Sequence, residues 1–470
     1  MKPMNVIKSI AGTAVLASSA VVVSAASSLP ASAASVNAAA CATSALTNAS
    51  GKVHITFYEA TAGANLTEIQ KLVTAFNNSQ NKVVVQDINQ PGGYVATWNA
   101  YTLSGGNGAN VIMDDMFNTQ AHVDSQLTLP IADCIAATGF KTSDYLPKTI
   151  VQQTISGQVQ ALPYSMSAPV LYYNKQAFAA AHLAPLSMTK PITIAQMVAD
   201  AKALKNAGYS DGMSLKNDPW WLQIWNGMAN QYFVNNQNGR AGRATAATFN
   251  NASSLSLLTQ LQTMTKGGYA KEFSATGTGL AAYDNLFDIS SNKSGMSIDT
   301  SAALGTIAGY LPLFKNVTLG VAPLPQISAS DKGGVQPGGN ALSISSKNTT
   351  AENAASWAFI QYLESAENLA TWDAATGYVP ITTAEAKTST ISKLWSKHPE
   401  YKVAYTAVST GTANNATVGP DLGNFYQVST DIGNALAHLL TDNAATPSSV
   451  IANAQSAATA DIQSYNASIN

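Results

Sequence analysis

Stretches of strand and helix periodicity alternate where the folded part of the chain begins. Residues 53–58 form an apolar strand pattern, residues 66–76 repeat apolar positions at helical intervals, and residues 82–88 return to a strand pattern. A strand, a helix and a strand at this spacing predict a βαβ unit in a parallel sheet, with ligands at the carboxyl ends of the strands. We therefore expect Tyr58 and Glu59, just past the first strand, in a turn that faces a cleft. A solvated loop carboxylate is the alternative for Glu59.

Two carboxylates end the next strand of the pattern. A helix pattern over residues 94–103, which begins with the candidate site residue Tyr94, is followed by apolar residues 111–113 and then by Asp114 and Asp115. An ionised carboxylate at a strand end accepts strong hydrogen bonds from hydroxyl groups. Because neighbours on a strand alternate faces, only one of the two points into a cleft, and we favour Asp115.

Residues 161–178 predict an extended segment that passes from one lobe of the protein to another. Two prolines, Pro163 and Pro169, favour extended backbone on either side of a short polar run, and residues 170–173 read as a buried strand. In that case Tyr164, Ser165 and Ser167 lie on the floor of a cleft between lobes, where small ligands commonly bind. The alternative is an ordinary buried strand.

The segment PWWLQIW, residues 219–225, is the most aromatic in the chain. An indole ring offers a flat apolar face on which the C–H face of a sugar can stack, with its hydroxyls left to polar groups at the edge. Trp220 and Trp221 are the candidates, and Trp225 is expected in the core. The alternative is that all three are core residues.

Candidates in the second half of the chain are hydroxyl, glycine, amide and aromatic residues near predicted strand or helix ends: Thr300, Ser301, Gly338, Gly339, Asn340 and Tyr378. Thr300 and Ser301 stand at a predicted helix start, where hydroxyls and free backbone N–H groups can face a ligand. The two glycines let the backbone approach a ligand closely.

Composition limits the classes of function. The chain has 470 residues, enough for two lobes with their own cores, and a formal net charge of -2 without a basic cluster, which argues against nucleic-acid binding. Charged residues make up only 11%, against about 25% in ordinary soluble proteins. Fewer ionisable groups mean less change of charge with pH, so we hypothesise an external, acidic setting. A sharp loss of structure at about pH 3–4, where carboxylates protonate, would contradict the hypothesis of an acidic setting.

The N-terminus carries an export signal in its pattern. Residues 1–33 combine a basic start, an apolar stretch and a small-residue cleavage site, which predict a cleaved secretory signal peptide and an exported protein. An uncleaved membrane anchor is the alternative. Residues 34–51 are small and polar and are expected to be mobile.

The chain has two cysteines, Cys41 and Cys134, and an exported protein favours a disulfide between them. Lipidation of Cys41 is less favoured, because residues 38–40 lack the large aliphatic residue usual before a lipidated cysteine. The five histidines show no zinc-binding spacing, so neither a metal site nor another cofactor is indicated.

The central segment resembles a family signature. It has the pattern of the extracellular solute-binding proteins of ABC importers, in the branch of glycerol-3-phosphate-, maltose- and oligosaccharide-binding proteins. The resemblance covers residue 53 to the C-terminus and rests on motifs in this order: ITFY, FNNSQ, LPYSMSAPVLYYNKQAF, WNG, GGNAL and TGYVPI. It implies a monomeric binding protein that performs no chemistry and delivers its ligand to a membrane permease.

The resemblance also implies an α/β fold, a two-lobe clamshell of the periplasmic-binding-protein type with three hinge crossings. The chain then crosses near residues 164–167, returns to the first lobe near residues 295–305 and crosses again near residues 336–345. The expected lobes are residues 52–163 plus 298–337 for lobe 1, and residues 164–297 plus 338–470 for lobe 2.

One departure from the family bears on the ligand. In the glycerol-phosphate branch an arginine in a glycine-rich segment near the C-terminus can hold phosphate, and the matching segment here, residues 418–425, has Asp421 at that place. A carboxylate repels phosphate, so a neutral sugar, oligosaccharide or polyol fits better than glycerol 3-phosphate or a glycerophosphodiester.

A secreted hydrolase is the third hypothesis. Residues 208–212 spell GxSxG around Ser210, but a nucleophile elbow needs a strand before the serine and a helix after it, and here a helix pattern precedes. The adjacent pair Asp114 and Asp115 is poorly placed for glycoside hydrolysis, which needs carboxyls on both sides of the scissile bond.

Overall fold

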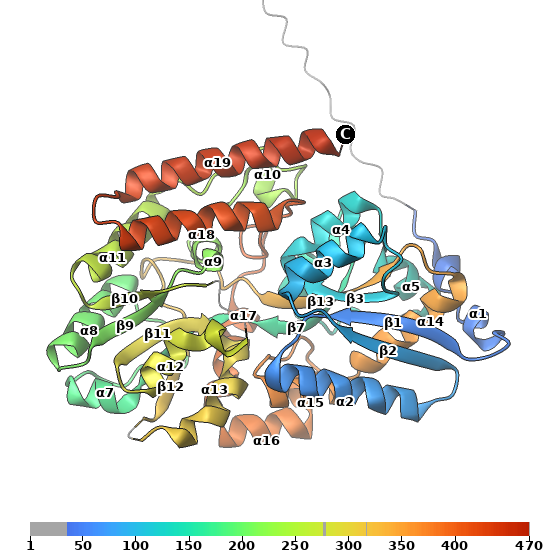
Figure 1. Ribbon diagram of the computed structural model, residues 1–470, viewed down its shortest axis with the longest axis horizontal. Coiled ribbons are helices and arrows are strands. Elements are labelled where there is room, and N and C mark those ends of the chain that lie inside the picture. Colours follow the sequence, from blue (N-terminus) through green and yellow to red (C-terminus); the bar gives the residue numbers. More distant parts are fainter. Residues whose placement is uncertain (1–34, 276–278, 316, 470) are drawn as a thin grey trace, which may run out of the picture. The chain divides into compact units, whose positions relative to one another are not determined.

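The computed structural model describes residues 35–275, 279–315 and 317–469. Its strands form two large sheets (Figure 1). The first has the order β2-β1-β3-β13-β4, with β7 also paired to β13. Its strands are β1 (Val53–Glu59), β2 (Val83–Asn89), β3 (Val111–Asp115), β4 (Thr128–Leu129), β7 (Leu162–Ser167) and β13 (Gly338–Ser345). The predicted βαβ unit is present, because β1 and β2 are parallel and are joined by α2 (Gly63–Ser79).

The second sheet has the order β10-β9-β11-β8-β12. Its strands are β8 (Pro169–Asn174), β9 (Asp211–Lys216), β10 (Ala270–Phe273), β11 (Ser294–Thr300) and β12 (Leu319–Pro323). The strands β9, β10 and β11 are parallel, whereas β8 runs antiparallel to both of its neighbours. A separate short hairpin joins β5 (Thr154–Ile155) and β6 (Gln158–Val159).

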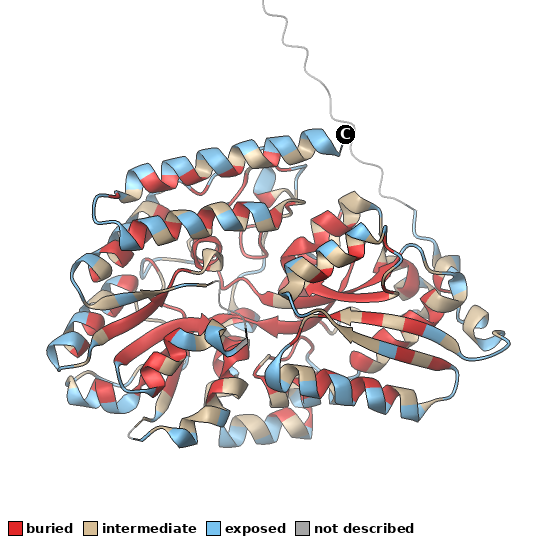
Figure 2. Ribbon diagram, viewed as in Figure 1, coloured by how far each residue is buried: buried red, intermediate tan, exposed pale blue. Residues whose placement is uncertain are grey.

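Helices cover both sheets. Those between β2 and β8 in the chain are α3 (Gly93–Leu103), α4 (Thr119–Ser125), α5 (Ile131–Thr138) and α6 (Pro147–Gln152). Those between β8 and β13 are α7 (Lys175–Ala180), α8 (Ile194–Asn206), α9 (Pro219–Met228), α10 (Asn235–Asn238), α11 (Ala252–Lys266), α12 (Asp284–Ser290) and α13 (Leu304–Tyr310). The last are α14 (Thr350–Leu363), α15 (Ala366–Thr376), α16 (Ser389–Lys397), α17 (Lys402–Thr410), α18 (Phe425–Thr441) and α19 (Pro447–Ser468). Figure 2 shows that buried residues gather along the strands and on the inward faces of these helices.

The chain passes between the sheets three times. The first passage is at Ala168, between β7 and β8, which is where the proline-bracketed segment predicts it. Every residue of β7 and β8 is buried, so this link lies inside the protein. The second passage joins β12 to β13. The third follows α15, which packs on α2, and precedes α17, which packs on β8 and β12.

Two of the expected lobe assignments are wrong in part. Residues 298–337 were expected in lobe 1, but β12 pairs with β8 of the second sheet, and β11 does not lead back to the first. Residues 338–470 were expected in lobe 2, but β13 lies between β3 and β4 of the first sheet, and α14 packs on β1 and β13. The end of that range agrees with the expectation, because α17 packs on β8 and β12 and α18 packs on α9 and α11. The reason for the errors is topological, because each sheet contains strands that are far apart in the sequence. The periodicity of a strand does not indicate which other strand it pairs with.

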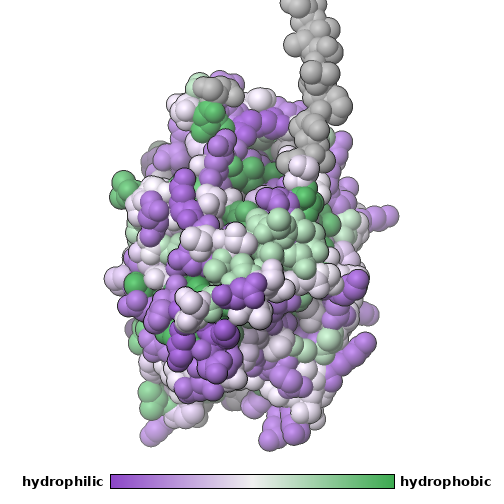
Figure 3. Space-filling model, turned by 90° about the vertical axis from the view of Figure 1, so that its right-hand side faces the viewer, coloured by the Kyte–Doolittle hydropathy of each residue, from purple (hydrophilic) through white to green (hydrophobic). Residues whose placement is uncertain are grey.

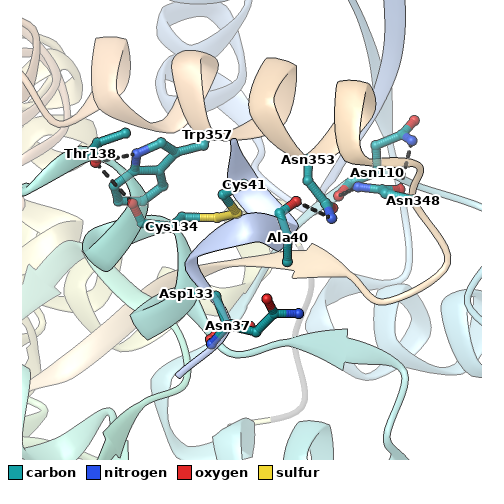
Figure 4. Close-up of a disulfide and its surroundings, with 10 residues drawn as sticks. All are labelled: Asn37, Ala40, Cys41, Asn110, Asp133, Cys134, Thr138, Asn348, Asn353 and Trp357. Carbon is teal, nitrogen blue, oxygen red and sulfur yellow. Dashed lines mark hydrogen bonds between the residues drawn. A yellow bond between two sulfur atoms is a disulfide. The ribbon is translucent and has the colours of Figure 1, made fainter. Parts of the chain in front are cut away.

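The N-terminal segment described by the structure is packed, and the expectation of a mobile 34–51 is wrong for it. Cys41, at the end of the 3-10 helix η1 (Ala38–Cys41), is fully buried and disulfide-bonded to Cys134 of α5 (Figure 4). The Asn37 backbone N–H donates to Asp133 at 2.7 Å, and Asn353 of α14 donates to the Ala40 carbonyl at 3.0 Å. These bonds fasten the segment to two helices of the first lobe. The expected signal peptide, residues 1–33, lies outside the described residues.

One face of the molecule is drawn in Figure 3. In Figure 3, weakly apolar residues gather in the middle of one face and hydrophilic residues border them. Among the described residues, no helix combines the length and the apolar character that crossing a membrane requires.

Candidate functional site

A cavity of about 410 Å³ lies between the two sheets and opens to solvent. The first sheet and its helices supply β3, the ends of β7 and β13, and α3; the second supplies the ends of β9 and β11 with α9 and α18. The lining residues are Tyr94, Asp115, Phe117, Ser167, Lys216, Asp218, Pro219, Trp220, Asp299, Thr300, Gly338, Gly339, Asn340, Tyr378, Phe425, Tyr426 and Ser429.

At the end of β3 the two neighbouring carboxylates face opposite ways. Asp115 lines the cavity, and its Oδ1 accepts the Phe117 backbone N–H at 2.9 Å, which caps a short 3-10 helix. Asp114 is buried and accepts from His122 Nε2 at 2.8 Å and from the Tyr426 hydroxyl at 3.1 Å. Asp114 therefore acts behind the site: it holds the hydroxyl of Tyr426, whose side chain lines the cavity.

His122 connects Asp114 to the sheet. Its Nδ1 lies 3.1 Å from Ser343 Oγ, and its ring stacks on Trp98 with 4.2 Å between ring centroids. The order serine, histidine, aspartate resembles a hydrolase triad, but Ser343 is 1% exposed and out of reach of a substrate. The arrangement is a buried support for Asp114.

The start of α9 places one of its two adjacent indoles in the cavity. Asp218 caps the helix by accepting the Trp220 N–H at 3.0 Å, and Pro219 occupies the first helical turn, where its missing N–H costs no bond. Trp220 lines the cavity against Gly338, whose lack of a side chain leaves room for the ring. Trp221 is 2% exposed and donates its indole N–H to the Lys216 carbonyl at 3.1 Å, so the expectation that it contacts ligand is not supported.

A buried ion pair lies at the ends of β9 and β11. Lys216 Nζ is 3.2 Å from Asp299 Oδ2 and also donates to the Ala282 carbonyl at 2.9 Å. Burial lowers the pKa of Lys216, but the nearby carboxylates Asp299 and Asp218 outweigh it and raise the pKa overall. The lysine is therefore charged and already paired.

The hydroxyls after β11 divide between the cavity and the first passage. Thr300 lines the cavity and caps the following 3-10 helix at Ala302. Ser301 is buried, and its Oγ accepts the Ala168 N–H at 3.3 Å. Ser301 thus holds the passage between the sheets, whereas Thr300 is the hydroxyl that a ligand can reach.

Backbone and aromatic groups complete the wall formed by β13. Gly339 has a φ of +126°, and a side chain there would collide with the Ser165 carbonyl, so this bend needs glycine. Asn340 donates to the Tyr94 hydroxyl. Tyr378 stacks on the buried Trp372 with 5.8 Å between ring centroids. Burial raises the pKa of Tyr94 and Tyr378, so both are neutral hydroxyls at physiological pH.

Several residues expected in the site lie elsewhere. Glu59 is fully buried and accepts from Thr61 N at 2.6 Å and Asn89 Nδ2 at 2.7 Å, so it closes its own turn. Tyr58 packs in a small apolar cluster with Ile112 and others and does not line the cavity.

The two expected floor residues Tyr164 and Ser165 are buried and do not line the cavity. Tyr164 packs on Trp372 with 5.4 Å between centroids, and Ser165 Oγ accepts the Trp372 indole N–H at 3.0 Å. In β7 it is the third candidate, Ser167, that lines the cavity.

Asp421 is also outside the cavity. It is paired with Arg240 at 2.9 Å and is shielded from solvent. Its charge is therefore met by the protein, and the expectation that Asp421 itself repels a phosphate group from the site is wrong.

Sequence reasoning missed several lining residues, which are Phe117, Lys216, Asp218, Pro219, Asp299, Phe425, Tyr426 and Ser429. One signal was available: Asp218 followed by Pro219 is the pattern of a capped helix start, which predicts the end of the preceding strand and hence the cleft. Phe425 and Tyr426 carry no such signal, because they come from α18, far from the other lining residues in sequence.

The GxSxG segment does not form a nucleophile elbow. α8 precedes Ser210, β9 begins at the next residue, and Ser210 is exposed with its carbonyl bonded to Lys205. A hydrolase elbow has the reverse order, strand and then helix.

Comparison with known proteins agrees with the fold. Residues 71–403 match the family described as bacterial extracellular solute-binding protein. The sn-glycerol-3-phosphate-binding periplasmic protein UgpB of Pectobacterium atrosepticum is 28% identical over 423 residues, which is 86% of this chain and 90% of that protein. The UgpB of Salmonella typhimurium is 27% identical over 351 residues, 72% of this chain and 76% of that protein.

Solved structures show the same fold at lower identity. The GacH receptor of Streptomyces glaucescens, studied unliganded and with acarbose, has a TM-score of 0.72 and 18% identity, covering 88% of this chain and 99% of that one. UgpB from Mycobacterium tuberculosis in complex with glycerophosphocholine has a TM-score of 0.73 and 18% identity, covering 88% of this chain and all (100%) of that one. The predicted α/β clamshell is thereby confirmed.

Proposed function

Since the chain belongs to the bacterial extracellular solute-binding proteins, the binding components of ABC importers, we propose that it captures a sugar, oligosaccharide or polyol in the cavity between its sheets and passes it to a membrane permease. The relatives are binding proteins, and their family is extracellular, in line with the export that the N-terminus predicts.

One observation carries the choice of ligand: the cavity combines aromatic rings with carboxylates and hydroxyls. Trp220 and Tyr378 offer flat faces for a sugar ring, and Asp115 and Asp218 offer acceptors for its hydroxyls. The cavity thus has the two kinds of group that a sugar needs.

A second candidate, glycerol 3-phosphate, is favoured by the sequence relatives, whose name states that they bind it. A phosphate dianion needs cations or several donors. The single lysine among the described lining residues is held by Asp299, and Asp115 and Asp218 would repel the anion. The chemistry of the lining therefore favours an uncharged hydroxylated ligand over a phosphate ester.

The test is a thermal-shift screen followed by calorimetry of the hits. The panel contains glucose, maltotriose, maltotetraose, sorbitol, sn-glycerol 3-phosphate and inorganic phosphate. We expect at least one saccharide or polyol to raise the melting temperature, because a ligand that binds only the folded state stabilises it. A response to glycerol 3-phosphate alone, or to none of the panel, would overturn the proposal.

A further inference from the structure

The charges that line the cavity do not balance. Asp115, Lys216, Asp218 and Asp299 line it, and Lys216 is committed to Asp299. Asp115 and Asp218 remain without a cationic partner among the described residues: none of the ion pairs includes either one. The cavity therefore has an excess of two carboxylates.

The two carboxylates also have oxygen atoms that accept no hydrogen bond from the described protein. Asp115 and Asp218 each accept one backbone N–H through Oδ1, and within the described part of the chain no donor reaches the second oxygen of either carboxylate. The Tyr426 hydroxyl proton goes to Asp114, so only acceptor capacity faces the cavity from that group. A matching ligand must bring more donors than acceptors at this place.

The surroundings of the two carboxylates make their charge costly once a ligand excludes water. Burial raises the pKa of Asp115 to about 7, with the neighbouring charges of Asp114 and Asp218 acting in the same direction. The phenols of Tyr94, Tyr378 and Tyr426 also face this region and bring no positive charge.

Asp218 is in a similar position. Burial raises its pKa and Asp299 adds to this, whereas Lys216 and the Trp220 N–H lower it. In the open cavity, water solvates the negative charge of both carboxylates. A sugar that displaces this water replaces it with neutral hydroxyl donors and brings no positive charge. A cation would offset the charge that a neutral guest leaves uncompensated.

We propose, resting on the function proposed above, that the cavity prefers a saccharide or polyol that carries a protonated amine to its uncharged counterpart, with Asp218 and Asp115 receiving the ammonium group. An ammonium has several N–H donors and is held by charge-assisted bonds, which are shorter and stronger than neutral ones. Trp220, two residues after Asp218, also lines the cavity. Its ring face can make a favourable cation–π contact with the ammonium group.

The test compares pairs of ligands that differ in the amine. D-glucamine is sorbitol with one hydroxyl replaced by a primary amine, and 1-amino-1-deoxymaltitol is maltitol with the same replacement; both amines are protonated at pH 8. Calorimetry at pH 8 and low salt should show tighter binding of the amine member by roughly tenfold or more, the size of a charge-assisted hydrogen bond. Raising the salt concentration should narrow the gap.

The variant Asp218→Asn removes the charge and keeps the helix cap, because asparagine also caps helices. We expect it to bring the two members of each pair to similar affinity, with the melting temperature nearly unchanged. Asp442→Asn, an exposed carboxylate outside the cavity, is the matched control and should leave the preference intact.

The outcomes separate this inference from the function on which it rests. Equal or tighter binding of sorbitol or maltitol, relative to the amine member of the pair, would overturn the amine preference and leave sugar binding standing. Binding of glycerophosphocholine but of neither amine compound would also overturn it, since a quaternary ammonium has no N–H donor. Absence of binding by every saccharide and polyol, with or without an amine, would overturn the proposed function itself.

Discussion

Single residues of this protein divide between the cavity and the core according to the phase of the element that carries them. Successive residues on a helix point about 100° apart, which follows from 3.6 residues per turn. Trp220 therefore reaches the cavity while Trp221 points into the core. The sequence PWWLQIW shows that aromatic residues are concentrated in this segment. It does not indicate which face of the helix is buried, because apolar residues occupy nearly every position.

Trp221→Ala should destabilise the fold by about 3–5 kcal/mol, the usual cost of removing a large buried aromatic side chain. Urea unfolding followed by circular dichroism measures this. Trp220→Ala, at a half-buried site, should cost clearly less. Equal losses for the two variants would mean that the indoles share one environment, contrary to the structure.

A site residue could be predicted from the sequence where its position depends on neighbours in the chain. It could not be predicted where its position depends on a residue far away in the sequence. Alternation along β3 singles out one carboxylate of the pair Asp114 and Asp115, and the structure places Asp115 at the cavity. The position of Asp421 could not be predicted, because Arg240, which pairs with it, lies far away in the sequence. The sequence of residues 418–425 contains no feature that indicates Arg240 as the partner of Asp421.

At the scale of elements, three buried carboxyls lie where α14, α15 and the 3-10 helix η6 (Glu385–Lys387) meet. Glu364 accepts the Tyr145 hydroxyl at 2.7 Å and Glu385 accepts the Ile381 backbone N–H at 2.9 Å, whereas each of the three carboxyls keeps an oxygen without a partner in the described structure. Burial raises the pKa of all three, that of Glu385 to about 7, and none is in an ion pair among the described residues. The neighbouring charge of Glu385 also raises the pKa of Asp373.

The charges around this group are also negative or neutral. Tyr164, with its hydroxyl unpartnered in the described structure, faces these carboxyls and Glu68. Tyr145 faces Glu364, Glu385 and the half-buried Asp144. None of the neighbours that the structure describes therefore compensates an ionised carboxyl, and protonation is the state that the packing favours.

Stability should fall as pH rises from about 4 to about 7.5. The folded pKa values exceed the unfolded values near 4, so the folded state binds more protons in this range, and unfolding becomes easier as they are lost. For Glu385 alone the cost is on the order of 3 kcal/mol. Denaturant unfolding at a series of pH values measures it.

The variant Glu364→Gln should flatten this pH dependence, because a glutamine can still bond to Tyr145 but does not ionise. Glu367→Gln, an exposed position of α15, serves as the control and should leave the curve as it is. Stability that rises steadily between pH 4 and 7 would contradict the account and the hypothesis of an acidic setting.

The disulfide is the second feature at this scale. It joins η1 to α5 across a sequence separation of 93 residues, so it restricts the unfolded chain strongly. Reduction, or the double variant Cys41→Ala and Cys134→Ala, should lower the free energy of unfolding by about 2–5 kcal/mol. Calorimetric melting measures the loss. An unchanged melting temperature after verified reduction would show that hydrogen bonds alone hold the N-terminal segment.

For the whole molecule, the fold class was predictable and the assignment of strands to lobes was not. The βαβ pattern and the proline-bracketed passage are local signals, and both appear where the sequence places them. β12 and β13 are adjacent in the chain yet belong to different sheets. Each is an apolar strand pattern, and choosing its sheet requires knowing which distant strand it joins.

Two lobes linked by three passages allow a hinge motion around the ligand. Small-angle X-ray scattering should show a smaller radius of gyration when a saturating saccharide is added. An unchanged scattering curve at confirmed saturation would indicate that the lobes do not close on the ligand.

The most direct test of the account is calorimetric titration of the wild type and Trp220→Ala with the saccharide or polyol selected by the screen. The account predicts one site per chain and an affinity lowered about fivefold or more in the variant, since the ligand loses the apolar area of the ring and an aromatic contact worth about 0.5–1.5 kcal/mol. Undiminished affinity in a folded Trp220→Ala variant would contradict the claim that the sugar binds between the lobes against this ring.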